Sequence, residues 1–260
     1  MNTETKRKLN AMLMHDFITA IEAQEANSSM YLPMSFDDRF NAIIDDVYQQ
    51  RHNEKIQRRI KIAKLRYPEA SIANIYFKSR SLNEGFIKQL GTMRFIDSAT
   101  NIIIQGFTGS GKTYLSCALA KEACKKDIKT YTIRLPELLQ KRSEEKILHR
   151  ENKYLHKLAS FSLLVIDEWL IFNLSEDDIK FLYELFELRY NRVSTIFVGQ
   201  YPVKDWHPRL GGGAHADSIL DRIVHNSITI ESGKTNMREI IDSNKYKSCL
   251  LYTSDAADEL

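Results

Sequence analysis

The feature that most constrains how this chain can fold is an eight-residue segment, Gly106 to Thr113, which reads Gly-Phe-Thr-Gly-Ser-Gly-Lys-Thr. It fits the pattern G-x-x-x-x-G-K-[ST] at every position. Glycines let the backbone turn tightly and approach phosphates closely, and successive N–H groups at a helix start form an anion nest. An apolar run at 102–104 precedes the segment, and a helical stretch from Tyr114 to Lys125 follows it. A strand, this loop and a helix in that order predict a nucleotide-binding P-loop.

The side chains of this loop have expected roles at the phosphates of ATP. Lys112 places an ammonium on the β- and γ-phosphates, and Thr113 supplies a hydroxyl to Mg²⁺. ATP and Mg²⁺ are therefore the predicted cofactors. We expect the following residues to bind the nucleotide: Gly106, Phe107, Thr108, Gly109, Ser110, Gly111, Lys112, Thr113, Tyr114 and Asp167.

A second element supplies the carboxylates that hydrolysis requires. Four apolar residues, 163–166, end in the adjacent acids Asp167 and Glu168. Ligands gather at the carboxyl ends of parallel strands, so we expect both acids to lie beside the P-loop. Asp167 would then hold Mg²⁺ together with Thr113, and Glu168 would polarise the attacking water as general base. A kinase for a small substrate has less need of the second carboxylate.

Apolar β-branched runs alternate with helical stretches from about residue 100 onward. The runs lie at 102–104, 131–133, 163–166 and 195–198. This alternation predicts an α/β fold, a parallel sheet flanked by helices. The clearest helix is 176–192, which Ser175 and Asp178 can cap.

The N-terminal part of the chain has a different pattern. Residues 1–90 are predicted to form a small helical region that binds DNA or a partner, and one of its helices begins after Ser35, with Phe40, Ile43, Ile44 and Val47 on its buried face. Residues 91–245 are predicted to form the P-loop ATPase domain. The last stretch, 246–260, matches no pattern around it and is interpreted as a non-native or disordered tail.

Three further polar residues are candidates for catalysis. Gln200 follows the apolar run 195–198, where an amide can reach the γ-phosphate or the attacking water; the alternative is a plain turn residue before Pro202. Arg222 and Arg238 are candidate cations for the charge that develops on the phosphate, and a guanidinium acting in trans requires an oligomer. The alternative for each arginine is a surface salt bridge.

Beyond these motifs, two stretches are characteristic of one family. The segment 200–207 reads Gln-Tyr-Pro-Val-Lys-Asp-Trp-His, and 220–226 reads Leu-Asp-Arg-Ile-Val-His-Asn. With the P-loop and the sequence Leu-Val-Ile-Asp-Glu, they resemble the IstB family, the ATP-binding helper proteins of IS21-type insertion sequences, over about residues 9–239. These proteins are related to helicase loaders of the DnaC type.

The resemblance implies an AAA+ ATPase that assembles on DNA in its ATP form, as a homo-oligomer, and assists a transposase. By position, Gln200 matches the sensor-1 place of the family, Arg222 its arginine-finger region and Arg238 its sensor-2-like place. Two departures concern these elements: Gly199 stands where relatives often have Ser, and the usual Gly-Glu-Ser-Met-Arg ending reads Thr235-Asn236-Met237-Arg238 here.

A basic stretch in the N-terminal region is the candidate for DNA contact. It contains Arg51, Lys55, Arg58, Arg59, Lys61, Lys64 and Arg66, opposed by Glu54 alone. Such a run can neutralise several phosphates without reading sequence, although a solvated basic helix face has the same composition. Tyr76, Phe77, Lys78 and Arg80 follow and mix aromatic with basic side chains.

Bulk composition adds three limits. The net charge of +3 is too small to indicate nucleic acid by itself, and no apolar run approaches the roughly 18 residues of a membrane span. The three cysteines show no metal spacing, and Cys117 and Cys124 are predicted to be reduced core thiols. These features favour a cytoplasmic protein that does not enter a membrane.

Three other functions remain open on sequence grounds. A replicative helicase loader would share the ATPase core and use the N-terminal region to bind a helicase. A P-loop kinase would transfer phosphate to a small acceptor without dependence on DNA. A scaffold that binds ATP without hydrolysing it would not need Lys112, Asp167 and Glu168 together.

Overall fold

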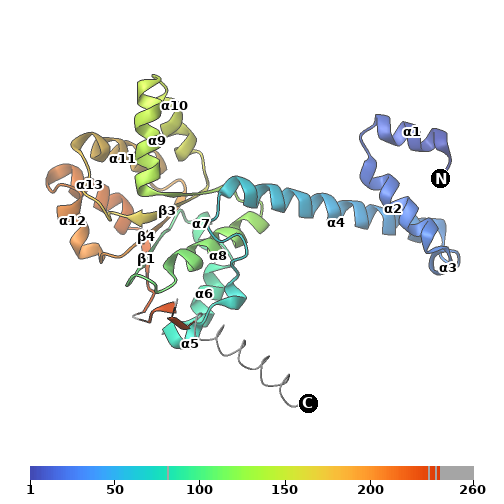
Figure 1. Ribbon diagram of the computed structural model, residues 1–260, viewed down its shortest axis with the longest axis horizontal. Coiled ribbons are helices and arrows are strands. Elements are labelled where there is room, and N and C mark those ends of the chain that lie inside the picture. The colour runs from blue at the N-terminus through green and yellow to red at the C-terminus, as the bar shows by residue number, and fades with distance from the viewer. Residues whose placement is uncertain (81, 234, 238, 241–260) are drawn as a thin grey trace, which may run out of the picture. The chain divides into compact units, whose positions relative to one another are not determined.

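The chain forms two compact units. A computed structural model describes residues 1–80, 82–233, 235–237 and 239–240, drawn as ribbon in Figure 1. By internal contacts the first unit is Met1–Arg58 and the second begins at Arg59. Residues 59–90, predicted from the sequence to be part of the N-terminal region, therefore belong by their contacts to the second unit. The functional division near residue 90 stays a prediction, and the predicted tail 246–260 lies outside the described residues.

The first unit is helical, as predicted. Its elements are α1 (Thr3–Ala11), α2 (His15–Ala26), α3 (Ser28–Tyr31) and most of α4 (Phe36–Ala63). The backbone N–H of Asp38 donates to Ser35 Oγ at 3.1 Å, so the predicted start of α4 is confirmed. The predicted buried face of α4 is largely wrong, because Val47 is buried while Phe40 and Ile44 are 47% and 38% exposed. Helix α1 packs on α2 and α2 on α3, and the side chains of Phe40 and Ile44 are left exposed.

A five-stranded parallel sheet forms the centre of the second unit. Its strands are β1 (Asn101–Gln105), β2 (Thr130–Arg134), β3 (Leu163–Trp169), β4 (Ser194–Gly199) and β5 (Ser227–Glu231), in the order β2-β3-β4-β1-β5. The first four match the predicted apolar runs. The fifth was not predicted, because it is an edge strand with a single fully buried side chain, Ile230. Strands β1, β3 and β4 lie side by side, so their carboxyl ends meet at one edge of the sheet.

Helices cover both faces of this sheet. The α-helices after α4 are α5 (Phe77–Arg80), α6 (Glu84–Leu90), α7 (Arg94–Asp97), α8 (Lys112–Lys125), α9 (Leu135–Ile147), α10 (Glu151–Ala159), α11 (Glu176–Arg189), α12 (Trp206–Arg209) and α13 (Gly213–Val224). Two 3₁₀ turns, η1 (Ile72–Asn74) and η2 (Val203–Asp205), complete the described elements. In Figure 1, α6 and α8 lie on one side of the sheet and α9, α10, α11 and α13 on the other.

Local sequence signals explain where these helices begin and end. Ser175 and Asp178 form a reciprocal capping box at the start of α11, as predicted, whereas the helix ends at Arg189, three residues before its predicted end. Tyr190 leaves the helix with an extended ψ of 128°. Helix α8 begins directly at Lys112, so the P-loop is continuous with the N-terminus of this helix. Cys117 and Cys124 are buried free thiols on α8, as their spacing predicted.

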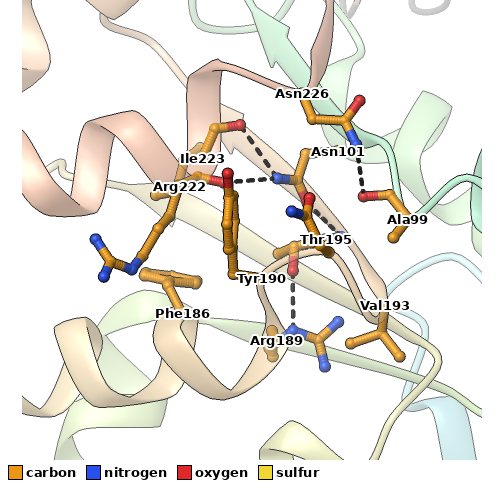
Figure 2. A pocket seen from close by; sticks show the side chains of 11 residues that line it. Ala99, Asn101, Phe186, Arg189, Tyr190, Val193, Thr195, Arg222, Ile223 and Asn226 are labelled. Carbon is orange, nitrogen blue, oxygen red and sulfur yellow. Dashed lines mark hydrogen bonds between the residues drawn. The ribbon is translucent and has the colours of Figure 1, made fainter.

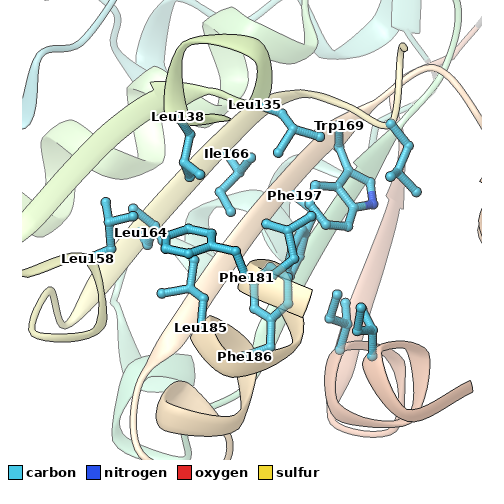
Figure 3. Packing of buried hydrophobic residues seen from close by; sticks show 14 of the residues in the cluster. Leu135, Leu138, Leu158, Leu164, Ile166, Trp169, Phe181, Leu185, Phe186 and Phe197 are labelled. Carbon is cyan, nitrogen blue, oxygen red and sulfur yellow. The ribbon is translucent and has the colours of Figure 1, made fainter. Parts of the chain in front are cut away.

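The core beneath α9, α10 and α11 is rich in aromatic rings where it approaches the carboxyl edge of the sheet. The ring of Trp169 lies 4.9 Å from that of Phe197 and 5.8 Å from that of Phe186 (Figure 3). The ring of Trp206 lies 5.6 Å from that of Trp169. Trp206 also donates its indole N–H to the carbonyl of Tyr201 at 2.9 Å. Trp206 is thus a packing residue, which holds the chain after β4 against the end of β3. Among the described residues, no helix combines the length and apolar character that a membrane crossing demands.

Candidate nucleotide-binding site

The P-loop lies at the carboxyl end of β1, between Gln105 and α8. Gly109 and Gly111 have φ values of +82° and +80°, a conformation that side chains with a Cβ rarely adopt. A Cβ at Gly109 would collide with Asn236 Oδ1, and one at Gly111 would lie 3.1 Å from Arg80 Nη1. Both glycines are therefore required by backbone conformation and by close neighbours, and the loop has the fold that a phosphate-binding nest needs.

Lys112 is buried and turned back over this loop. Its Nζ donates to the carbonyl oxygens of Gly106 and Phe107, each at 2.7 Å. These contacts keep the ammonium above the loop backbone, at the first turn of α8, where the helix dipole also favours an anion. Loop and ammonium together form a cationic site for a polyphosphate.

Thr113 and Asp167 meet across the gap between α8 and β3. Thr113 Oγ1 donates to Asp167 Oδ2 at 2.9 Å, and the Asp167 side chain is 6% exposed. A hydroxyl and a carboxylate side by side are oxygen ligands of the kind Mg²⁺ prefers, and Mg²⁺ keeps its remaining positions for water and phosphate. The residues present therefore fit the metal that the P-loop pattern implies.

Glu168 stands next to this pair because β3 is bulged there. Ile166 pairs with Phe197 and Trp169 with Gly199, so two residues of β3 oppose one residue of β4. Glu168 has a φ of +56° and donates its backbone N–H to Asp167 Oδ1 at 2.8 Å. Arg134 Nη1, from the end of β2, lies 3.6 Å from Glu168 Oε1. The bulge breaks the alternation of side chains, and a strained backbone of this kind is typical of functional sites.

Gln200 is exposed at the same edge of the sheet. It follows Gly199, which pairs with Gln105 on one side and Trp169 on the other, so Gln200 stands between the P-loop and the end of β3. The topology thus brings five predicted site residues to the carboxyl edge of the sheet: Gly106, Lys112, Thr113, Asp167 and Gln200. Their roles in catalysis stay predictions.

Arg222 lies at the opposite edge. Asn101, the first residue of β1, donates to the carbonyl oxygens of Arg222 and Ile223 at 3.4 and 3.1 Å (Figure 2). At about 3.3 Å a residue, the length of β1 puts about 13 Å between this point and the P-loop. The guanidinium is paired with Glu187 and lies 5.0 Å from the Tyr183 ring centre. Arg222 therefore cannot serve the P-loop of its own chain, and Arg238 lies outside the described residues.

Two residues near the site were not identified from the sequence. Arg134 contacts Glu168, and Arg80, which was grouped with possible DNA-binding residues, is only 3% exposed and packs against Gly111. The position of Arg134 directly after an apolar run was a usable signal, because β2 also ends at the carboxyl edge. Nothing in the local sequence around Arg80 signals its burial.

A hollow of about 410 Å³ opens beside the acidic end of β3. It is lined by Lys64, Arg66, Thr132, Ile133, Arg134, Glu137 and Asp167. Two cations of the basic stretch, Lys64 and Arg66, thus face the same space as Asp167. The hollow makes the site accessible from the side on which β2 ends.

Comparison with known proteins agrees with this geometry. A family model described as IstB-like ATP binding protein matches residues 7–245. A relative from Sinorhizobium fredii, named an insertion sequence ATP-binding protein, is 30% identical over 90% of this chain and 95% of its own length.

Two solved structures share the fold. AMPPCP-bound DnaA from Aquifex aeolicus superposes with a TM-score of 0.56 at 21% identity, over 70% of this chain and 56% of that one. The DnaC helicase loader superposes with a TM-score of 0.54 at 19% identity, over 64% of this chain and 98% of that one. At these identities the likeness establishes the P-loop AAA+ fold and nothing more specific.

Proposed function

The chain belongs to the family of IstB-like ATP-binding proteins, and from this premise we propose that it hydrolyses ATP with Mg²⁺, assembles on DNA and assists a transposase. The observation that carries the hydrolysis proposal is the contact between Thr113 and Asp167, with Glu168 beside it. A P-loop that only binds nucleotide has no need of a second carboxylate at this point. The name of the relative from Sinorhizobium fredii supports the link to an insertion sequence.

In the proposed mechanism the residues act mainly by position and charge. Lys112 neutralises the β- and γ-phosphate oxygens, which lowers the cost of the charge that develops there. Thr113 and Asp167 would hold Mg²⁺, which when bound would stabilise negative charge on the phosphate oxygens. Glu168 accepts a proton from the attacking water, and Gln200 orients that water from the neighbouring strand end.

The contact between Arg134 and Glu168 influences the position of the proposed general base. The Arg134 guanidinium lies 3.6 Å from the Glu168 carboxylate and restrains where that side chain lies. The same ion pair also draws Glu168 toward the end of β2. A nucleotide that recruits Glu168 to the water would have to compete with Arg134 for it.

Arg222 is proposed to act in trans. Because it lies at the sheet edge opposite its own P-loop, a phosphate contact requires a second copy of the chain placed head to tail. Its pairing with Glu187 and Ser218 in the single chain holds the guanidinium in one place before assembly. Arg238 is proposed as the sensor-2-like cation on the strength of the family resemblance alone.

The basic stretch is proposed to bind DNA through phosphates. Arg51, Lys55, Arg58, Lys61, Lys64 and Arg66 are exposed, and Arg59 is half-buried. Arg51 is paired with Asp16 and Arg59 with Asp127, so part of the charge is already compensated. A smaller number of phosphates than cations is therefore expected to be neutralised, without preference for sequence.

ATP turnover with and without duplex DNA tests the hydrolysis proposal. We expect DNA to raise turnover of the wild type, added salt to remove the increase, and Glu168→Gln to abolish turnover while ATP still binds. Lys112→Ala is the matched control that should lose ATP binding itself. Turnover that ignores DNA, or a Glu168→Gln variant as active as the wild type, would contradict the proposal.

The DNA surface has a test of its own. Replacing Arg58 and Lys61 by Ala should weaken DNA binding and lower the slope of log K against log salt by about 2, because each phosphate that is no longer neutralised reduces the slope by roughly 0.9. Lys153 and Lys157 on α10 are exposed and supply a control pair with the same change in net charge. Equal effects of the two double variants would show that only net charge matters.

The helicase-loader alternative makes a different prediction about partners. A transposition helper should bind and stimulate the transposase encoded beside it, whereas a loader should bind a replicative helicase. Co-purification with each candidate in the presence of ATP separates the two. Capture of the helicase alone would transfer the proposal to the loader function.

A further inference from the structure

Arg80 is a buried cation that contacts the phosphate-binding loop. It ends the short helix α5, and its side chain is 3% exposed. Its guanidinium packs against the bare backbone of Gly111, where an added Cβ would lie 3.1 Å from Nη1 and 3.2 Å from Cζ. Gly111 directly precedes Lys112, so two cations, Arg80 and Lys112, lie at neighbouring points of one loop.

This guanidinium has few partners in the described part of the chain. Nη2 donates to Ser232 Oγ, which in turn donates to the carbonyl of Ser110 at 2.9 Å. Among the described residues Nε has no hydrogen-bond partner, and no described carboxylate lies within ion-pair distance. Burial alone lowers the pKa of Arg80 to about 10. Within the described part of the chain, Arg80 is thus a buried charge without a counter-charge.

Two other buried arginines show how this chain normally treats such a group. Arg142 is 4% exposed and pairs with three carboxylates, Glu151, Asp177 and Asp178. Arg189 is 2% exposed and donates to the Thr195 hydroxyl and to four backbone carbonyl oxygens. Among the described residues Arg80 has one acceptor where these have three and five, although burying a charge without partners is costly.

The location of Arg80 identifies the missing counter-charge. The nearest structure built to receive an anion is the P-loop itself, and Gly111 lacks the side chain that would separate Arg80 from the loop backbone. We propose that Arg80 is a nucleotide-binding residue that donates to a phosphate oxygen of the nucleoside polyphosphate in the loop. This inference rests on the proposed function only in that ATP is the ligand.

The arrangement also links the nucleotide to the segment after β5. Ser232 bridges Arg80 to Ser110, and a Cβ at Gly233 would lie 2.5 Å from the Arg80 carbonyl oxygen, so the chain there runs directly over Arg80. A phosphate that draws the guanidinium toward the loop pulls on the Ser232 contact. Ser232 and Gly233, the two residues directly after β5, therefore respond to whether the site is loaded.

A ligand-binding role and a structural role of Arg80 predict opposite changes in the ligand-free Tm when its charge is removed. Arg80→Met keeps the length and apolar stem of the side chain but removes the charge. If Arg80 awaits a phosphate, the variant should have an unchanged or higher Tm without nucleotide, a smaller ATP-induced rise in Tm, and a Kd for ATP weakened about 10- to 100-fold. Arg80→Lys should recover part of the affinity because it restores the charge.

Arg142→Met is the matched control. Removing that arginine should lower the ligand-free Tm and leave the Kd for ATP unchanged, because its partners lie away from the P-loop. Binding is measured by titration of ATP and ADP against each full-length variant, with thermal unfolding on the same samples.

Three results would overturn the inference. They are an unchanged Kd for ATP in Arg80→Met, a fall in its ligand-free Tm with the ATP-induced rise intact, or an Arg80→Lys variant as weak as Arg80→Met. Failure of the proposed function is distinguishable, because then the wild type would not bind ATP, or Lys112→Ala would bind it as well as the wild type.

Discussion

Replacing Gly111 by Ala should destabilise the chain by about 2 kcal/mol. Gly111 has a φ of +80° and a ψ of 19°, the left-handed conformation, which costs a residue with a Cβ roughly 1–2 kcal/mol. The new Cβ would also lie 3.1 Å from Arg80 Nη1, tighter than ordinary contact. Because the guanidinium is the flexible end of a side chain, it can shift, and this contact should add less than about 1 kcal/mol.

Gly85→Ala is the matched control for this prediction. Gly85 lies in α6, is exposed, and an added Cβ would meet only Asn83 Oδ1, at an ordinary 3.5 Å. A glycine replaced by alanine in a helix gains about 0.5–1 kcal/mol. The two variants carry the same added methyl group, so they should move in opposite directions and differ by about 3 kcal/mol.

Thermal unfolding and chemical denaturation measure this difference. For a domain of this size 1 kcal/mol corresponds to about 2–4 °C, so Gly111→Ala should lower Tm by about 4–8 °C and Gly85→Ala should raise it slightly. Gly111→Ala should also bind ATP more weakly, since the methyl group displaces Arg80 and the loop backbone. A Gly111→Ala variant as stable as Gly85→Ala, with unchanged ATP affinity, would refute the reasoning.

Three further predictions concern other parts of the second unit. Thr113→Val should retain the fold but lose Mg²⁺-dependent ATP turnover, while Thr113→Ser keeps it; a Mg²⁺ titration of turnover decides. Arg142→Met should cost about 1–3 kcal/mol of unfolding free energy at neutral pH, because three carboxylates lose their partner. Hydrogen bonds from Lys146 and Arg142 lower the pKa of Asp177 below its usual 3.8. The stability that Asp177 contributes is therefore fully present above pH 3.8 and is lost as the pH falls further. Chemical denaturation at pH 7 and at pH 3 should show that the difference in unfolding free energy between wild type and Arg142→Met is smaller at pH 3. Burial raises the pKa of Cys124 to about 11, so its thiol should resist iodoacetamide at pH 8 in the folded chain and react after urea unfolding, as peptide mass spectrometry can establish.

Much of the nucleotide site was readable from the sequence because its chemistry is local. The P-loop needs glycines, a lysine and a hydroxyl at fixed spacing, and a carboxylate pair after a buried strand needs only the chain around it. Four of the five strands and the capped start of α11 followed from the same kind of short-range pattern. The family resemblance added the order of these motifs along the chain.

Other features were wrong or missing because they depend on residues far apart in the sequence. Phe40 and Ile44 follow a helical apolar pattern, yet they are exposed, since burial requires another element to cover them. Strand β5 joins the sheet through pairing with β1, over 120 residues earlier in the chain, and has little apolar signal of its own. The bulge at Glu168 exists only in the register between β3 and β4.

The arginines show most clearly what the sequence determines and what only the tertiary structure determines. By itself the sequence determined that this chain has a P-loop, an acid pair after a buried strand and a small surplus of cations, because those are properties of residue type and spacing. Only the tertiary structure decided where each cation lies: Arg80 is buried against Gly111, Arg134 faces Glu168, and Arg222 lies at the far edge of the sheet. The physical reason is that a guanidinium acts through what lies within a few ångströms of it, and those neighbours are set by strand order and packing.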